Sequence, residues 1–257
     1  MPRVTRITIF PIKALDGRDV SEARVLRNGA LENDRRWALV DGQGRFVHGK
    51  RTPAIHAIRA TFDGLLHSVT LSGAANASLF RLPEETPGIA AWIGEALELK
   101  IRVIENAGGG FPDDGEAPGP TLVSTASLAA TASWFEGLDV AEMRRRIRAN
   151  LEIDAPEPFW EDQLADDGSG RRKFSVGNVA YRGRTICMRC IVPTRDSQSG
   201  AGLAGFARTF AARRASELRA WSPVEQFDHY YRLAVNTSAD WVPTDAVIRI
   251  GDAVAVV

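Results

Sequence analysis

The chain has 257 residues and equal numbers of basic and acidic side chains, 32 of each, so its formal net charge is zero. This balance gives no overall attraction to nucleic acid or to an anionic membrane, and any anion site must be local. The chain has no apolar run of roughly 18 residues and no signal-peptide core, and its two cysteines form no disulfide framework, so we expect a cytoplasmic protein without a membrane or nucleic-acid partner.

The first 106 residues predict a section built mostly of short strands. Turn signals such as Asp16-Gly17 and Asn28-Gly29 separate runs of β-prone residues. One amphipathic helix is expected at 89–97. Strands are expected at 4–10, 20–26, 37–40, 46–47, 55–62, 68–71 and 99–104. Such close spacing is typical of a barrel or a sandwich.

A change of composition marks the middle of the chain. Residues 107–120 are rich in glycine, proline and aspartate and poor in large apolar side chains. We therefore expect a linker here and divide the chain into domains at 1–106 and 107–257.

The second half predicts helices as well as strands. Ser124 or Thr125 can cap a helix running through 128–135, an arginine-rich helix should follow at 140–148, and a third is expected at 203–221. Strands are expected at 151–153, 173–176, 179–181, 185–192, 229–235, 247–250 and 253–257. The fold class is therefore mainly β with some helices (α+β).

Both cysteines lie in Cys187-Met-Arg-Cys190, which should end a strand. A structural zinc site needs four ligands, and a thioredoxin-type pair needs a following helix, where Pro193 stands instead. One thiolate binding a redox-active metal, with Arg189 and Arg195 favouring its ionised form, is a third interpretation. Two buried thiols acting as small apolar side chains are equally compatible with the spacing.

Two other patterns are weaker. Gly200, Gly202 and Gly205 match the dinucleotide fingerprint but follow a polar turn instead of a buried strand, so we expect no Rossmann site. Arginines crowd the second half, where they suit phosphate but also suit a solvated helix face.

An ordered set of motifs resembles the MOSC family, the molybdenum-cofactor sulfurase C-terminal-type domain. In the first half the motifs are Phe10-Pro-Ile-Lys13, Asp34-Arg-Arg-Trp37 and Leu39-Val-Asp41. In the second half they are Arg148-Ala-Asn150, Phe159-Trp-Glu-Asp162, Cys187-Met-Arg-Cys190 with Thr194, Asp196 and Gly200, and 227–236. The set covers nearly the whole chain.

The resemblance implies a fold, a cofactor and a site. It implies an N-terminal MOSC β-barrel domain at 1–106 packed on a barrel-like MOSC core at 107–257, with a molybdenum cofactor (Mo-molybdopterin) between them. Cys190 would be the metal ligand, and Arg189 would bias its thiolate as the second catalytic residue. The cofactor-binding residues would be Lys13, Arg35, Ser124, Ser127, Arg148, Asn150, Thr194 and Asp196. The resemblance implies no role for Cys187.

The activity implied by the resemblance is the reduction of N-hydroxylated small molecules, such as amidoximes or hydroxylamines. The chain has no credible flavin or NAD motif and too few cysteines for an iron–sulfur cluster, so we expect a separate electron-donor protein. Two alternatives stay open. One is a non-catalytic carrier of the cofactor or a sulfur-handling protein, and the other is a cofactor-free thiol pair.

Overall fold

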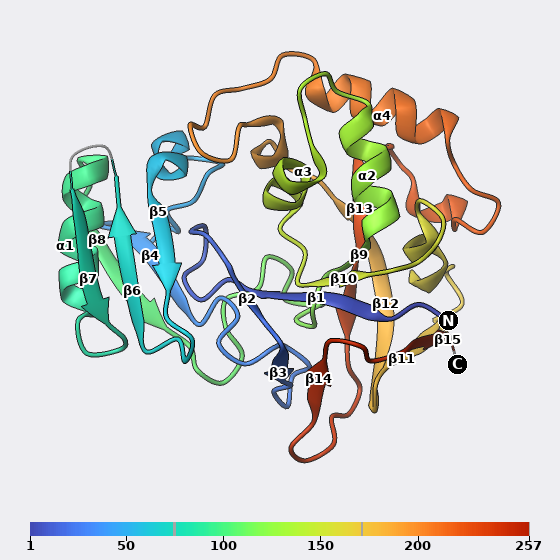
Figure 1. Cartoon of the computed structure of the whole chain (residues 1–257), viewed down its shortest axis with the longest axis horizontal. Coiled ribbons are helices and arrows are strands. Elements are labelled where there is room, and N and C mark those ends of the chain that lie inside the picture. Colours follow the sequence, from blue (N-terminus) through green and yellow to red (C-terminus); the bar gives the residue numbers. More distant parts are fainter. Residues whose placement is uncertain (74–75, 171, 257) are drawn as a thin grey trace.

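The computed structural model describes residues 1–73, 76–170 and 172–256. The fold is α+β, with strands more abundant than helices, as predicted. Figure 1 shows one group of short strands with helix α1 at the left and a larger sheet beside helices α2, α3 and α4 at the right. Both chain ends lie together at the right edge, where the N–H of Val254 donates to the carbonyl of Pro2.

The first half consists mainly of strands. They are β1 (Val4–Ile9), β2 (Arg18–Val20), β3 (Glu22–Arg24), β4 (Trp37–Asp41), β5 (Arg59–Phe62), β6 (Ser68–Ser72), β7 (Ala77–Arg81) and β8 (Ile101–Glu105), with the 3-10 helix η1 (Pro53–Ala57) and helix α1 (Thr86–Leu97). The strand expected at 55–62 was wrong in its first half, because Pro53 starts η1. Strand β7 was not predicted. Exposed and half-buried residues alternate along it, and none of its residues is fully buried.

The second half combines strands with helices or helical turns, three before the cysteines and three after them. Its strands are β9 (Leu122–Ser124), β10 (Leu151–Ile153), β11 (Lys173–Val176), β12 (Val179–Met188), β13 (Arg232–Ser238), β14 (Val247–Arg249) and β15 (Val254–Val256). Its helices are α2 (Thr125–Ser133), α3 (Val140–Ile147), η2 (Trp160–Leu164), η3 (Val192–Thr194), α4 (Phe206–Ser216) and η4 (Val224–Gln226). Residue 257, with which the last strand was expected to end, lies outside the described residues.

Two boundaries near the cysteines differ from expectation. The strands expected at 179–181 and 185–192 form one strand, β12, which ends at Met188, shortly before the proline-containing turn η3. Helix α4 is shorter than the expected 203–221. It starts after Gly205, whose φ of 75° is left-handed, and buries Phe206 and Phe210.

The main sheet has eight strands in the order β15-β11-β12-β13-β9-β10-β1-β2. Strand β1, from the start of the chain, pairs antiparallel with β10, and β10 pairs parallel with β9. An isolated bridge between Arg3 and Ala253 brings the β15 end of the sheet against β1. The chain therefore crosses the expected boundary at residue 106 within one sheet; the barrel-like form and the division into two domains stay predictions.

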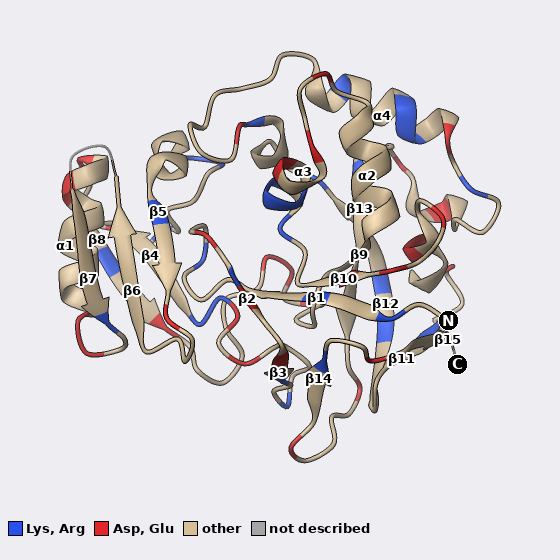
Figure 2. Cartoon of the chain, in the orientation of Figure 1, with Lys and Arg blue, Asp and Glu red and all other residues tan. Residues whose placement is uncertain are grey.

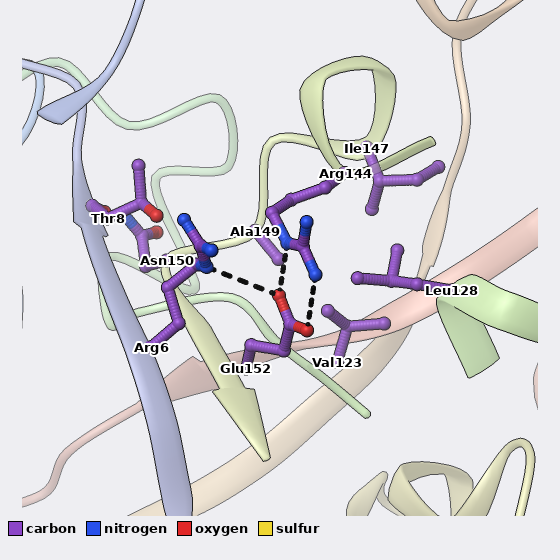
Figure 3. A pocket seen from close by; sticks show the side chains of 9 residues that line it. All are labelled: Arg6, Thr8, Val123, Leu128, Arg144, Ile147, Ala149, Asn150 and Glu152. Atoms are coloured by element: carbon purple, nitrogen blue, oxygen red, sulfur yellow. Dashed lines mark hydrogen bonds and ion pairs between the residues drawn. The ribbon is translucent and has the colours of Figure 1, made fainter. Parts of the chain in front are cut away.

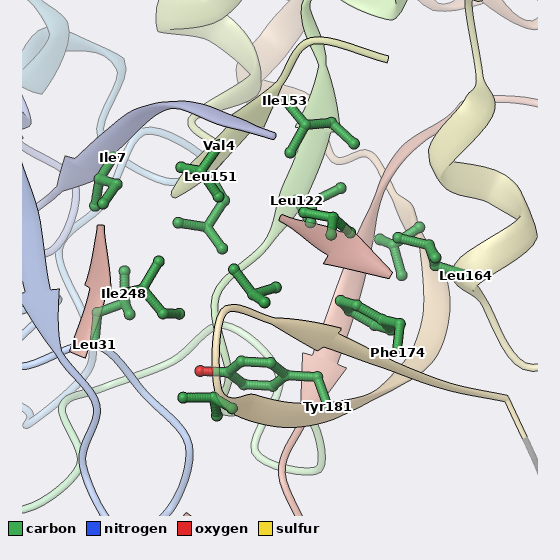
Figure 4. Close-up of a cluster of buried hydrophobic side chains, with 14 of the residues drawn as sticks. Val4, Ile7, Leu31, Leu122, Leu151, Ile153, Leu164, Phe174, Tyr181 and Ile248 are labelled. Atoms are coloured by element: carbon green, nitrogen blue, oxygen red, sulfur yellow. The ribbon is translucent and has the colours of Figure 1, made fainter. Parts of the chain in front are cut away.

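Two large clusters of buried apolar residues lie behind these sheets. Figure 4 shows the first, in which Val4, Ile7 and Leu151 of β1 and β10 pack with Phe174 and Tyr181 of β11 and β12. The second lies under α1 in the smaller group of strands. Each cluster removes several large apolar side chains from water, the main source of folding free energy.

Helices α2, α3 and α4 share a third cluster with Leu233 and Ala234 of β13. This packing fixes α3 relative to β13, the strand that follows the cysteines. Among the described residues, no helix is both long and apolar enough to cross a membrane.

Candidate functional site

A cavity of about 870 Å³ is lined by residues from both halves of the chain. Ten lysine or arginine side chains and four aspartates line it, so its walls are strongly cationic although the whole chain is neutral. Figure 2 shows basic residues gathered on α3 and on the chain beside it. Cavities of this size commonly enclose a drug-sized ligand, and this charge favours an anionic one.

The two cysteines lie on the wall of this cavity at the end of β12. Cys187 is the second-to-last residue of β12, and Cys190 lies two residues beyond the end of the strand. Both thiols are free and partly buried. The backbone N–H of Val192 donates to Cys190 Sγ at 3.4 Å. The prediction that these thiols end a strand is confirmed, and neither is sealed in the apolar core.

Arg189 also lines the cavity, but it contacts the other cysteine. Its Nη1 donates to Cys187 Sγ at 3.1 Å, and its Nη2 donates to the carbonyl of Ile147 at 2.7 Å. The side chain of Arg189 therefore binds Cys187 instead of the expected Cys190.

Lys13 and Arg35 form the first cationic group of the cavity. Lys13 Nζ is 2.7 Å from Asp113 Oδ1 and donates to the carbonyl of Phe111 at 2.9 Å, and Arg35 Nε is 4.0 Å from Asp113. Partial loss of hydration beside the cavity would by itself raise the pKa of Asp113, whose side chain is 73% exposed, but Arg35 and Lys13 hold the pKa of that carboxyl well below its usual range. The expected linker at 107–120 thus forms part of the cavity wall and carries two of its four aspartates, Asp113 and Asp114.

Removing the charge of Asp113 should strengthen anion binding. We expect Asp113→Asn to bind inorganic phosphate more tightly than the wild type at low salt, by a factor on the order of ten, because Lys13 and Arg35 lose a competing carboxylate. Isothermal titration calorimetry measures this affinity. Asp114→Asn is the matched control, since Asp114 also lines the cavity but accepts only from the backbone N–H of Glu116. Equal affinities in the two variants would contradict the assignment.

Arg148 and Asn150 lie beside this group. The guanidinium of Arg148 is 4.2 Å from the centre of the Phe10 ring, and that of Arg35 is 5.3 Å from the same ring. Burial, with the nearby charge of Arg35 adding to it, lowers the pKa of Arg148 to about 10. Asn150 donates to the carbonyl of Thr8 at 3.1 Å, which holds the segment after α3 against β1.

Arg35 and Arg148 share an uncommon backbone conformation. Their φ angles are 51° and 56°, in the left-handed region that residues other than glycine seldom adopt. Arg148 is the C-cap of α3, and its Nη2 donates to the carbonyl of Leu15 at 2.6 Å. Such strain is most often retained where it places a side chain for function.

Thr194 and Asp196 are not among the described residues that line the cavity. Thr194 donates to the carbonyl of Ile191 at 2.7 Å, and Asp196 accepts from the backbone N–H of Ser199 at 2.7 Å. Both shape the turn that follows Cys190, so the structure gives them a supporting position instead of direct access to a ligand.

Ser124 and Ser127 are also absent from the described cavity lining, because both are fully buried. Ser124 caps α2 by accepting from the N–H of Ser127 at 3.0 Å, which confirms the predicted cap. Ser127 Oγ donates to Glu161 Oε2 at 2.9 Å. The structure therefore places these two serines in a buried network inside the core, and their contact with a cofactor stays a prediction.

That network gives the fold a pH dependence. Burial of the carboxyl, with Asp162 adding to the effect, raises the pKa of Glu161 from 4.5 to about 6. The folded state thus binds this proton more tightly than the unfolded state. The contribution to stability is complete below about pH 4.5 and is lost as the pH rises through about 6.

Glu161→Gln should remove this loss. We expect the free energy of unfolding of the variant, relative to the wild type, to improve by at most about 2 kcal/mol between pH 4.5 and pH 7.5. Urea denaturation at both pH values measures the difference. Glu157→Gln, an exposed neighbour in the same segment, should show no such change; a similar change there would contradict a specific role of Glu161.

A second, much smaller cavity of about 10 Å³ lies on the other side of α3 and is shown in Figure 3. The guanidinium of Arg144 binds Glu152 with two contacts, at 2.5 and 2.8 Å. This space holds one water molecule at most. The arginines of α3 therefore have different positions. Arg144 forms an ion pair with Glu152, whereas Arg145 and Arg146 line the large cavity.

Six basic residues of the large cavity were not predicted as site residues: Lys50, Arg59, Arg145, Arg146, Arg195 and Arg232. Arg145 and Arg146 stood out only as part of an arginine-rich helix, and Arg195 only as a neighbour of the thiols. Nothing in the local sequence around Lys50 or Arg59 marks either residue, and two of the partners of Arg59, Asp16 and Ser197, come from distant segments.

Several polar atoms of the cavity wall suit an anionic cofactor with hydrogen-bonding groups. Arg59 Nε, Arg189 Nε, His48 Nδ1 and His56 Nε2 are buried without a partner among the described residues. Within that part of the chain, no group of three or more His, Cys, Asp and Glu side chains is arranged to hold a metal ion. A metal bound by one of these cysteines would therefore take its other ligands from a cofactor.

The fold and the cavity define the class of protein: an α+β chain with a cationic cavity, suited to an anionic ligand, beside two thiols at a strand end. A family model described as the MOSC N-terminal beta barrel domain matches residues 1–87. The chain is also 36% identical to mitochondrial amidoxime-reducing component 1 of Homo sapiens, over 77% of this chain and 67% of that protein. The chain therefore belongs to the MOSC family, which is associated with the molybdenum cofactor.

Proposed function

We propose that this chain binds a molybdenum cofactor in the 870 Å³ cavity and reduces N-hydroxylated small molecules of the amidoxime or hydroxylamine type. The observation that carries the proposal is the convergence of Cys190 with Lys13, Arg35, Arg148 and Asn150 on the wall of that one cavity. The similarity to a protein named for amidoxime reduction supports the reaction type.

Each cavity residue has a role in this proposal. Lys13, Arg35 and Arg148 would neutralise the phosphate of the cofactor, since fixed cations bind phosphate strongly. Cys190 would provide the one protein ligand to molybdenum, and Arg189 would hold the side chain of Cys187 in place beside it through its hydrogen bond. Asn150 keeps the segment after α3 in place through its hydrogen bond to Thr8.

When bound, the cofactor supplies the two-electron couple that cleavage of an N–O bond requires. The overall reaction consumes two electrons and two protons and releases water and the reduced nitrogen compound. We propose that a separate donor protein delivers the electrons. A reducing compartment, which we take to be the cytoplasm, would keep both thiols free.

The test compares protein from hosts with and without the ability to make the cofactor. We expect molybdenum and pterin only in protein from the competent host, and consumption of benzamidoxime only by that sample when a chemical reductant is added. Protein that carries molybdenum and pterin but consumes no N-hydroxylated substrate would instead be a carrier or a sulfur-handling protein. Metal-free protein from the competent host with a reversible Cys187–Cys190 disulfide would favour the thiol pair.

A further inference from the structure

The cations of the large cavity fall into two groups, according to the histidine on which they act electrostatically. The first group lies near His48, on which Lys13 and the carboxylate of Asp113 act. The proposed cofactor contacts use mainly this first group. Arg148, Arg195 and Arg59 act on His56. Arg59, Arg195 and His56 all line the cavity, and none of them has a role in cofactor binding so far.

The second group joins the two halves of the chain beside the cysteines. His56 lies in η1, and Arg59 opens β5. Arg59 Nη2 donates to the carbonyl of His56 at 2.5 Å and to that of Ser197, in the turn after the cysteines, at 3.1 Å. A Cβ added at Gly49 would lie 2.6 Å from His56 Nε2 and 3.2 Å from Val192 Cγ2. Gly49 thus lies in contact with both His56 and Val192, the residue whose N–H donates to Cys190.

The positive charge of this group is poorly compensated. Arg59 Nη1 lies 3.3 Å from Asp16 Oδ1, whereas the side chain of Arg195 makes no hydrogen bond or ion pair with any described residue. Arg59 Nε and His56 Nε2 are buried and have no partner in the described part of the chain. The carboxylate of Asp196 also acts on His56, but its Oδ1 already accepts from Ser199 and its Oδ2 lies 3.9 Å from Arg146 Nη2.

These contacts leave several buried nitrogen atoms of the group without a hydrogen-bond partner among the described residues. Guanidinium groups form paired hydrogen bonds to planar or tetrahedral oxyanions, and like charges held together without a counterion are unfavourable. A carboxylate or a phosphate would satisfy the free donors and remove the repulsion. Because this group adjoins the turn after Cys190, such an anion would be held close to the reacting centre.

We propose that Arg59 and Arg195, together with His56, bind a carboxylate or phosphate group of the substrate, so that the preferred substrates are N-hydroxylated anions. This inference takes the N-hydroxylated group of the substrate from the proposed function, whereas the anion site itself is argued from the cavity residues alone. Arg195 is the specificity-determining residue, since its side chain has no other role among the described residues. Arg59 also holds the two halves together and is less suitable for a test.

The test uses cofactor-loaded protein and two probes, benzamidoxime and its 4-carboxylate. Calorimetric titration of the oxidised protein without an electron donor measures binding without turnover. We expect the wild type to bind the carboxylate probe about tenfold more tightly, because a charge-assisted hydrogen bond is worth that much or more. In Arg195→Gln the ratio should fall to near one, with the affinity for benzamidoxime unchanged. Arg213→Gln, an exposed arginine on α4, is the control and should keep the wild-type ratio.

The outcomes separate this inference from the proposed function. Equal affinities for the two probes in the wild type, or a ratio unaltered by Arg195→Gln, would overturn the anion site even if the protein reduces both compounds. A tenfold preference in protein that reduces neither compound would support the anion site while the proposed reaction fails. A nucleotide attached to the pterin released from the loaded protein, with no preference between the probes, would assign the cations to the cofactor and overturn the inference.

Discussion

The Cys190→Ala variant, expressed in a host that makes the cofactor, is expected to contain about tenfold less molybdenum than the wild type, or less still. Even substitutions of residues that only support the metal ligands commonly lower metal affinity by about that factor. The thiolate is the donor atom that the chain would offer to the metal at this position. Amidoxime reduction should fall with the metal content. Elemental analysis and pterin release on the purified protein measure both components, and a thermal melt checks that the variant is folded.

Two neighbouring substitutions make this result specific. Ile191→Ala changes the next residue, which is 52% exposed, and should retain the metal. Cys187→Ala removes the thiol that Arg189 contacts and should also retain most of it. Full metal content in Cys190→Ala would end the proposal. If only Cys187→Ala lost the metal, Cys187 and not Cys190 would be assigned as the metal ligand.

Asp162→Ala is expected to cost about 3–5 kcal/mol of unfolding free energy, the usual penalty for leaving one member of a buried ion pair without its partner. Asp162 pairs with Arg214, and their side chains are 1% and 0% exposed. Ser222 donates to the same carboxylate at 2.5 Å, and the guanidinium of Arg214 lies 3.9 Å from the centre of the Phe159 ring. The substitution would leave a guanidinium charge enclosed by apolar and aromatic groups.

A surface ion pair provides the control for this experiment. Asp240 pairs with Arg182, and the two side chains are 56% and 27% exposed. Asp240→Ala should change the unfolding free energy by no more than about 1 kcal/mol, because water screens the pair. Urea denaturation of both variants gives the comparison. A cost below that of the surface variant would show that Arg214 reaches water after the substitution.

The predictions that held depend on neighbours in sequence. Ser124 caps α2 because a serine before a helical run satisfies free backbone N–H groups wherever the chain goes. The cysteines end a strand because β-prone residues precede them and a proline follows. Phe206 and Phe210 are buried in the same helix, as their spacing indicated. Even here the ends of elements moved, since η1 and η3, each with a proline in its first turn, overlap the ends of expected strands.

The sequence by itself determined the fold class, the strand that carries both cysteines and the helix cap at Ser124, because each follows from local backbone preference and side-chain pattern. Only the tertiary structure decided which side chains meet. It brought Lys13, Arg35, Asp113 and Arg148 from four distant segments to one cavity, directed Arg189 to Cys187, and enclosed Ser124 and Ser127 in the core. Such contacts depend on how the sheet and the helices pack, and this packing buries apolar surface without regard to the position of a charge in the sequence.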